Sequence, residues 1–259
     1  MGTSNAGDMY QAMFLGIGVI NVGIFVWAFV LWRRSREPAL ALTLIPVFFF
    51  AWDNFRIAAG PVLGFGVSLY WLTWPAYWAH WLCGSWLIIA SGAVLRLANV
   101  SFVRSRWVMG AFCLLATGLT LRDLPQFWTR DLYPLCDLEL IRYGISVKES
   151  ARCSPTQAVV AGSVPITPVI ACMIALGAGV AIWIRQRIPW LALGSIGMLI
   201  AASPIFSSHG LEYLGEAIIE GGLVASVWSM TRRVDVPETT GEARSNSPKT
   251  VEKILGGGR

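Results

Sequence analysis

Hydrophobic residues in this chain form long runs that are rarely broken by a polar position. A run of about 20 residues crosses roughly 30 Å of hydrocarbon as a helix, at about 1.5 Å per residue. Seven such runs lie at Tyr10–Trp32, Ala39–Ala59, Ala76–Leu97, Trp107–Leu121, Ala158–Ile184, Trp190–Phe206 and Leu211–Met230. The fourth and sixth are the shortest. The pattern predicts an all-α fold, a bundle of seven transmembrane helices.

Arginines in the short connections predict the orientation of this bundle, because cytosolic loops carry an excess of basic residues. The connections after the first, third, fifth and seventh runs are basic: Arg33, Arg34, Arg36; Arg96, Arg104, Arg106; Arg185, Arg187; Arg232, Arg233. The segments on the opposite side, Met1–Asp8, Pro61–Pro75 and Ser207–Gly210, contain no lysine or arginine. We therefore expect a non-cytosolic N-terminus and a cytosolic C-terminus.

The chain divides into one membrane domain and a tail. Residues 1–233 contain all seven runs, and the polar residues 234–259 are expected to form a disordered cytosolic tail. One long connection, about residues 122–157, is predicted on the non-cytosolic side. It contains Cys136 and Cys153, which are expected to form a disulfide in an oxidising compartment.

Composition removes the soluble alternative. Hydrophobic residues make up 55% of the chain and charged residues 14%, whereas soluble domains carry about 25% charged residues. The net charge of +5 gathers at the ends of the apolar runs, which indicates contact with lipid headgroups and no nucleic-acid partner. We expect a multi-pass integral membrane protein of the endoplasmic reticulum or the plasma membrane.

Polar residues inside the second run are the first candidates for function, since ionisable groups within a membrane are costly. The segment FFFAWDNFRIAAG places Asp53, Asn54 and Arg56 in apolar sequence. Asp53 and Arg56 are three residues apart, so they share a helix face and can neutralise each other. The alternative is an ion pair that only fixes helix packing.

The last run carries a row of ionisable residues. His209, Glu212, Glu216 and Glu220 follow at intervals of three, four and four, so a continuous helix places them on one face. Three carboxyl groups facing lipid would be prohibitively costly, so this face must point into the bundle or into a wet cavity.

The third run is rich in aromatic residues. Trp78 and Trp81 lie on one face near His80, deeper than the expected aromatic belt at the membrane surface. At the helical rise, His80 falls at a depth similar to that of Asp53 and of the first turns of the last helix. Ionisable groups from three helices at one depth predict a single cavity in the outer half of the membrane.

Several kinds of chemistry are excluded by missing residues. No metal site is expected, because two histidines without metal-ligand spacing leave only a mixed histidine and carboxylate set. The last helix has no lysine for a retinal Schiff base. Ser208 and His209 are adjacent in sequence, so they point in different directions and cannot form a hydrolytic pair. A proton or ion carrier and general acid catalysis both remain open.

An acid beside aromatic faces in a dry pocket is what a carbocation cyclase requires. The chain resembles, distantly, the compact seven-helix integral-membrane terpene cyclases of fungal meroterpenoid pathways. The resemblance rests on the FAWDN segment with Asp53 and on Glu212 or Glu216 in the last helix. The family typically has Trp-Glu in the early helix and aspartate in the late one. The resemblance implies acid-initiated cyclisation of an isoprenoid or prenylated, epoxidised substrate in a secondary-metabolite pathway.

Four residues are therefore predicted to be catalytic. Asp53 and Glu212 are the expected proton donor and its partner, and His80 and Glu216 are expected to tune them. An enzyme of the isomerase or lyase type is favoured, with no cofactor.

Four further residues are predicted to contact the hydrophobic isoprenoid-type substrate. Trp78 and Trp81 would stabilise the cation, and Asn54 and His209 would bind the substrate. The alternative function is a non-catalytic membrane protein, namely a small-ligand receptor, a proton or ion transporter, or a scaffold subunit.

Overall fold

The computed structural model describes residues 5–129, 131–162, 166–207 and 209–234, so nearly all of the predicted tail at 234–259 lies outside the described residues. The chain is mostly helical. Its helices are α1 (Asn5–Ser35), α2 (Pro38–Leu63), α3 (Val67–Leu97), α4 (Arg106–Asp123), α5 (Pro125–Thr129), α6 (Ile166–Gln186), α7 (Trp190–Ala201), α8 (Pro204–Ser207) and α9 (Glu212–Val234). Two 3-10 turns (Ser101–Arg104 and Glu149–Ala151) and two strands, β1 (Tyr133–Asp137) and β2 (Leu140–Gly144), complete it.

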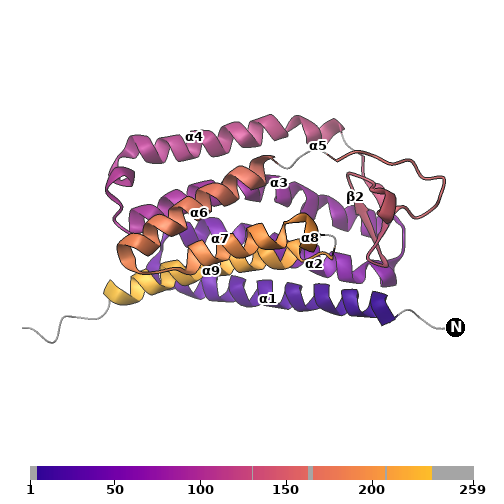
Figure 1. Ribbon diagram of the computed structural model, residues 1–259, viewed down its shortest axis with the longest axis horizontal. Coiled ribbons are helices and arrows are strands. Elements are labelled where there is room, and N and C mark those ends of the chain that lie inside the picture. Colours follow the sequence, from indigo (N-terminus) through magenta and orange to yellow (C-terminus); the bar gives the residue numbers. More distant parts are fainter. Residues whose placement is uncertain (1–4, 130, 163–165, 208, 235–259) are drawn as a thin grey trace, which may run out of the picture.

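The long helices run side by side as one bundle, with α4 at its edge (Figure 1). A continuous apolar core, which includes Leu40, Ile88, Ile182 and Leu223, fills the space between α2, α3, α6 and α9. Large apolar side chains also cover the outside, as at Ile184, which is 72% exposed. An apolar exterior around an apolar core is the arrangement that a lipid environment stabilises.

Within the described residues, four helices are long and apolar enough to cross a membrane: Ala6–Ser35, Pro38–Leu63, Val67–Leu97 and Ile166–Gln186. The other three predicted spans do not meet this description, for different reasons. α4 ends in charged residues, and α9 contains three glutamates. The predicted span Trp190–Phe206 is not one helix, because α7 ends at Ala201 and α8 begins at Pro204.

Two basic turns at one end of the bundle are built alike. Arg36 after α1 and Arg187 after α6 have φ angles of 56° and 57°. Each donates its backbone N–H to the carbonyl four residues earlier, at 2.8 Å, which ends the helix. A proline soon follows, Pro38 at the start of α2 and Pro189 just before α7. The chain therefore reverses within three residues at these arginines.

Glycines let α7 and α9 pack backbone against backbone. A Cβ atom on Gly222 of α9 would lie 2.5 Å from the carbonyl oxygen of Trp190. A Cβ atom on Gly194 of α7 would lie 2.8 Å from the carbonyl oxygen of Ile218. Small residues commonly permit such close helix contacts in membranes. The short helix α7 is thereby fixed along α9, the helix that carries the row of glutamates.

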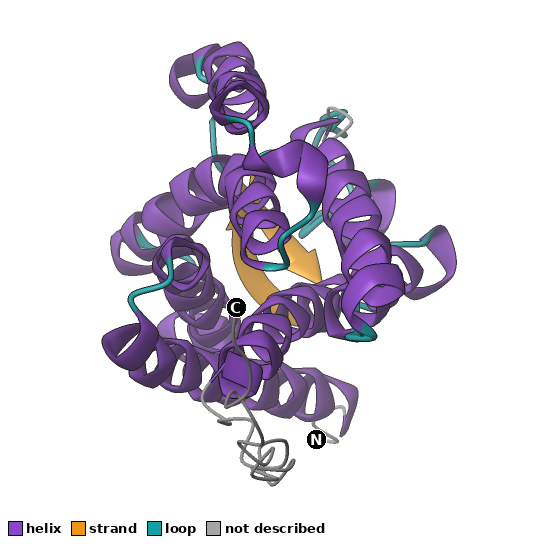
Figure 2. Cartoon of the chain, turned by 90° about the vertical axis from the view of Figure 1, so that its left-hand side faces the viewer, coloured by secondary structure: helices purple, strands orange, loops and turns teal. Residues whose placement is uncertain are grey.

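The predicted outer connection is folded and adds two short strands to the otherwise helical chain. Strands β1 and β2 pair antiparallel, with Tyr133 opposite Gly144 at the open end and Asp137 opposite Leu140 beside the turn. Leu138 and Glu139 form the two-residue turn with φ angles of 55° and 60°, the geometry of a type I′ hairpin. Figure 2 looks along the bundle and shows these strands across the middle of its far end.

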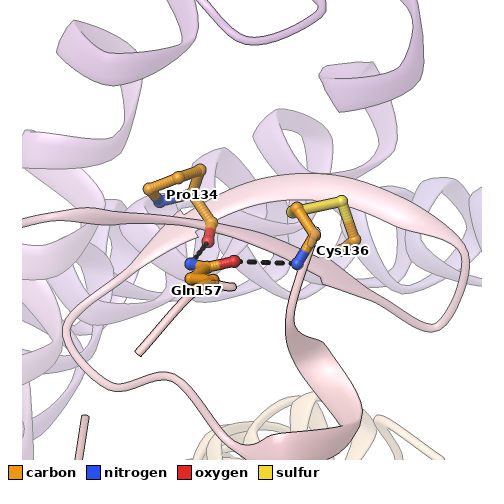
Figure 3. Close-up of a disulfide and its surroundings, with 4 residues drawn as sticks. Pro134, Cys136 and Gln157 are labelled. Carbon is orange, nitrogen blue, oxygen red and sulfur yellow. Dashed lines mark hydrogen bonds between the residues drawn. A yellow bond between two sulfur atoms is a disulfide. The ribbon is translucent and has the colours of Figure 1, made fainter. Parts of the chain in front are cut away.

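The hairpin is fixed by covalent and hydrogen bonds. Cys136 and Cys153 form the predicted disulfide, with Cα atoms 4.9 Å apart. Gln157 donates its side-chain N–H to the Pro134 carbonyl at 2.7 Å, and its Oε1 accepts the Cys153 backbone N–H at 2.8 Å (Figure 3). The segment after β2 is thereby tied back to β1.

The hairpin also rests directly on α2. A Cβ atom on Gly60 would lie 1.8 Å from the carbonyl oxygen of Ile141. Any larger residue at this position would therefore push the strand away from the helix. On the α3 side, the Tyr143 ring packs edge-on against Tyr70, with centroids 5.4 Å apart. The hairpin is thus positioned by two neighbouring helices.

Candidate functional site

A cavity of about 280 Å³ lies between the hairpin and the helices α2, α3 and α9. Its lining combines charged, aromatic and apolar side chains. The lining residues are Asp53, Arg56, Thr73, Ala76, Tyr77, His80, Leu132, Leu135, Arg142, Tyr143, Gly144, Ile145, Ser146, Pro168 and Tyr213. We call this space the outer cavity. It brings together two of the residues predicted to be catalytic, Asp53 and His80.

The predicted ion pair in α2 forms one wall of the outer cavity. Arg56 donates from Nε and Nη2 to Asp53 Oδ1, at 2.9 and 2.5 Å. Its Nη1 donates to the hydroxyl of Thr73 in α3 at 3.1 Å, and that hydroxyl donates to the carbonyl of Leu69 at 2.7 Å. Both charged side chains are buried. Spacing along one helix turn therefore creates the pair, and α3 completes its hydrogen bonding.

His80 and Glu216 form a second pair between α3 and α9. His80 Nε2 lies 2.9 Å from Glu216 Oε1, while the other carboxyl oxygen of Glu216 is buried without a hydrogen-bond partner in the described structure. The imidazole also packs edge-on against Phe50, with ring centroids 5.7 Å apart. His80 is also a lining residue of the outer cavity, so the pair lies at the wall of that space.

A smaller cavity of about 60 Å³ continues below the pair, and we call it the inner cavity. It shares His80 and Pro168 with the outer cavity, and Glu216 and Glu220 also line it. Glu220 is 3% exposed, and its Oε2 has no hydrogen-bond partner among the described residues. Buried polar groups without partners are uncommon. Two of the three glutamates of α9 therefore line the inner cavity, within the bundle.

The hairpin supplies Arg142, which the sequence had not suggested. Its Nη1 donates to the Tyr213 hydroxyl at 2.8 Å, and its Nη2 donates to the Asp137 carboxylate. Burial acts to lower the pKa of Arg142, but Tyr213 and Asp137 outweigh it, so the pKa is raised and the guanidinium stays charged. The Phe14 ring packs edge-on against Tyr213 at 5.1 Å and holds it in place.

Glu212 and Asn54 lie near the cavities without lining either of them. Glu212 begins α9, is partly buried and interacts electrostatically with Arg142 first, and then with Glu216 and His80. Asn54 is fully buried and donates to the Phe50 carbonyl at 2.8 Å.

The remaining residues predicted to bind substrate lie elsewhere. Trp78 packs edge-on against Trp128, with centroids 5.7 Å apart, and lines neither the outer nor the inner cavity. The side chain of Trp81 is outside the part of the chain that the structure describes. His209 is exposed and precedes α9, because Gly210, with a φ of 72°, separates it from the helix. The predicted stripe therefore includes the three glutamates but not His209.

Tyrosines rather than tryptophans provide the aromatic lining. Tyr77, Tyr143 and Tyr213 face the outer cavity from α3, β2 and α9. Tyr213 directly follows Glu212 and therefore points away from the glutamate stripe in a helix. Among the described residues, no group of three histidine, cysteine or carboxylate side chains is arranged to hold a metal ion.

No protein-family model, curated protein or solved structure matches this chain.

Proposed function

We propose that the chain crosses the membrane seven times, with its N-terminus outside and its C-terminus in the cytosol, as a protein of the endoplasmic reticulum or plasma membrane. The arginine-rich turns after α1, α3 and α6 lie at the end of the bundle opposite the hairpin (Figure 1). Basic turns at one end support a cytosolic assignment of that end. The disulfide in the hairpin supports a non-cytosolic assignment of the other.

We further propose that the outer cavity binds an isoprenoid or prenylated substrate and cyclises it by acid catalysis. The observation that carries this proposal is the His80–Glu216 contact of 2.9 Å at the cavity wall. It places an acid–base pair beside a space lined largely by apolar and aromatic residues. Such a pair can donate a proton to a substrate that offers only an alkene or an epoxide.

The proposed reaction needs no second reactant. For an epoxide, the His80–Glu216 pair gives a proton to the ring oxygen, and a carbon–oxygen bond breaks. The π electrons of a neighbouring alkene then form a carbon–carbon bond to the electron-poor carbon. Loss of a proton from the last cation restores an alkene and returns the proton to the protein. The product is therefore an isomer of the substrate.

Other lining groups fit the developing positive charge. The Asp53 carboxylate is part of the cavity lining and can receive the final proton. The faces of Tyr77, Tyr143 and Tyr213 can stabilise a cation through the ring quadrupole. Both arginines are paired with carboxylates, Arg56 with Asp53 and Arg142 with Asp137, so their repulsion of a cation is largely cancelled.

The test is product formation by the purified protein from an epoxyfarnesyl phenol. We expect a cyclic product of unchanged mass. Glu216→Gln and Asp53→Asn should each reduce its formation by about 10²–10⁴-fold, the usual contribution of a general acid or base. Glu149→Gln, which changes an exposed acid outside the cavity, should have no effect.

Glu212→Gln separates the two possible donors in α9. If Glu212→Gln abolishes product and Glu216→Gln does not, Glu212 is the acid and the His80–Glu216 pair is not the proton donor. If correctly folded variants at Asp53, Glu212 and Glu216 all keep full activity, the cyclase proposal fails.

A proton carrier is the second candidate, supported by the inner cavity. Glu216 and Glu220 are one helix turn apart, and each has a carboxyl oxygen without a partner in the described structure. Rows of buried acids are typical of proton pathways. In liposomes containing a pH-sensitive dye, this candidate predicts a proton flux that Glu220→Gln abolishes. A cyclase predicts no flux and a smaller effect of that substitution.

A further inference from the structure

We propose that the outer cavity recognises a substrate with a singly charged oxygen head group, such as a carboxylate, and that Arg142 binds this group. The inference rests on the proposed function only in treating the outer cavity as the substrate site. The chemical class of the substrate and its orientation in the cavity are the new elements. The head would lie at the hairpin end, and the apolar tail would point towards His80.

The first observation is an unused hydrogen-bond donor. The Arg142 guanidinium has five N–H donors, and its hydrogen bonds to Tyr213 and Asp137 use one donor on Nη1 and one on Nη2, so further donors are unused in the described structure. A buried guanidinium donor without a partner costs free energy that an acceptor on a ligand would recover. Because Arg142 lines the outer cavity, that acceptor can belong to a bound molecule.

The second observation is the charge of the lining. Two guanidinium groups, those of Arg56 and Arg142, face the outer cavity together with one carboxylate, that of Asp53. Asp53 is bound to Arg56 within α2. Asp137 binds Arg142 from the hairpin and is not part of the lining. The lining therefore holds one more guanidinium group than carboxylate, and one anionic oxygen of a ligand would balance that difference.

The third observation is the rigidity of the position. The Tyr213 hydroxyl holds one side of the guanidinium, and the disulfide at Cys136 and the contact at Gly60 fix the strand pair that carries it. A preorganised donor loses little conformational entropy when it binds. Arg142 therefore has the geometry of a recognition residue, in addition to its structural hydrogen bonds.

The test compares two ligands with the same tail. Binding of tritiated farnesoic acid to the purified protein in non-ionic detergent is measured by scintillation proximity, and farnesol is the uncharged competitor. A charge-assisted hydrogen bond predicts that the acid binds at least about tenfold more tightly than the alcohol. Arg142→Gln should remove this preference. Arg152→Gln is the matched control, because Arg152 pairs with Glu149 outside the lining and should leave the preference intact.

Asp137→Asn separates recognition from support. If Asp137 competes with the ligand for Arg142, this substitution should strengthen binding of the acid by several-fold, whereas a purely structural pair predicts weaker binding. Retention of the Cys136–Cys153 disulfide and a monodisperse elution profile show that each variant is folded.

Three results would overturn the inference: no binding of the acid by the wild-type protein, equal binding of acid and alcohol, or a preference for the acid that survives Arg142→Gln. No turnover is required. A protein that selects the acid but forms no cyclic product would refute the cyclase and leave this inference standing.

Discussion

Removing one partner of the Asp53–Arg56 pair should destabilise the protein far more than removing an exposed carboxylate with the same spacing. In the wild-type protein, Arg56 Nη2 lies 2.5 Å from Asp53 Oδ1. Asp53→Asn leaves the Arg56 guanidinium buried without this counter-ion. Loss of one partner of a buried pair costs about 3–5 kcal/mol. That free energy corresponds to a change of roughly 150- to 5,000-fold in the folding equilibrium.

The chain contains a matched control for this experiment. Glu149 and Arg152 are also an acid and an arginine three residues apart, but the Glu149 side chain is 71% exposed. Exposed pairs contribute only about 0.2–1 kcal/mol. Glu149→Gln should therefore change stability by less than about 1 kcal/mol. The difference between the two substitutions isolates the effect of burial.

The assay is unfolding by sodium dodecyl sulfate in mixed micelles, followed by tryptophan fluorescence of the 13 indole groups. A double variant, Asp53→Asn with Arg56→Met, provides the coupling energy, because it removes both charges and should recover much of the loss. Equal effects of Asp53→Asn and Glu149→Gln would refute the reasoning. Such a result would mean that the pair is hydrated, and it would also weaken the case for an enclosed cavity.

Three other predictions concern topology and the hairpin. Tags at residues 2 and 259 should react with membrane-impermeant reagents only at the N-terminal end in intact cells, and labelling of both ends would contradict seven crossings. Mass spectrometry without reductant should show the Cys136–Cys153 linked peptide, and free alkylation of both thiols would disprove the bond. Cys153→Ser should destabilise the segment by about 3 kcal/mol, because the disulfide closes a loop with a sequence separation of 17 residues. Gly60→Val should displace the hairpin from Ile141 and increase hydrogen exchange in β2, and unchanged exchange would show that the contact is not needed.

Local patterns in the sequence predicted the features that depend on one helix. Long apolar runs predicted the main helices, and a spacing of three predicted the Asp53–Arg56 pair. The same logic failed at His209, because periodicity assumes a continuous helix and Gly210 interrupts it. Trp78 has the expected spacing, but its ring packs against Trp128 of α5. Spacing gives the face of a helix, whereas the neighbour on that face depends on packing.

The hairpin could not be predicted from its turn. Type I′ turns favour Asn-Gly because both central residues have positive φ angles. In this chain Leu138 and Glu139 occupy those positions, so the sequence carries no turn signal. Arg142 and Tyr143 therefore looked like residues of an irregular loop. The disulfide was predictable from the two cysteines, but the strand pairing that directs Arg142 towards the bundle was not.

The order in which the two charged pairs form has a consequence for synthesis of the protein. Asp53 and Arg56 lie one turn apart, so the charges of α2 are matched as soon as this helix forms. His80 receives its carboxylate only from Glu216, about 136 residues later. At about 5–20 residues per second, this interval lasts roughly 7–27 s. During that time the nascent chain has an unfinished site, which an insertase or chaperone would have to tolerate until α9 arrives.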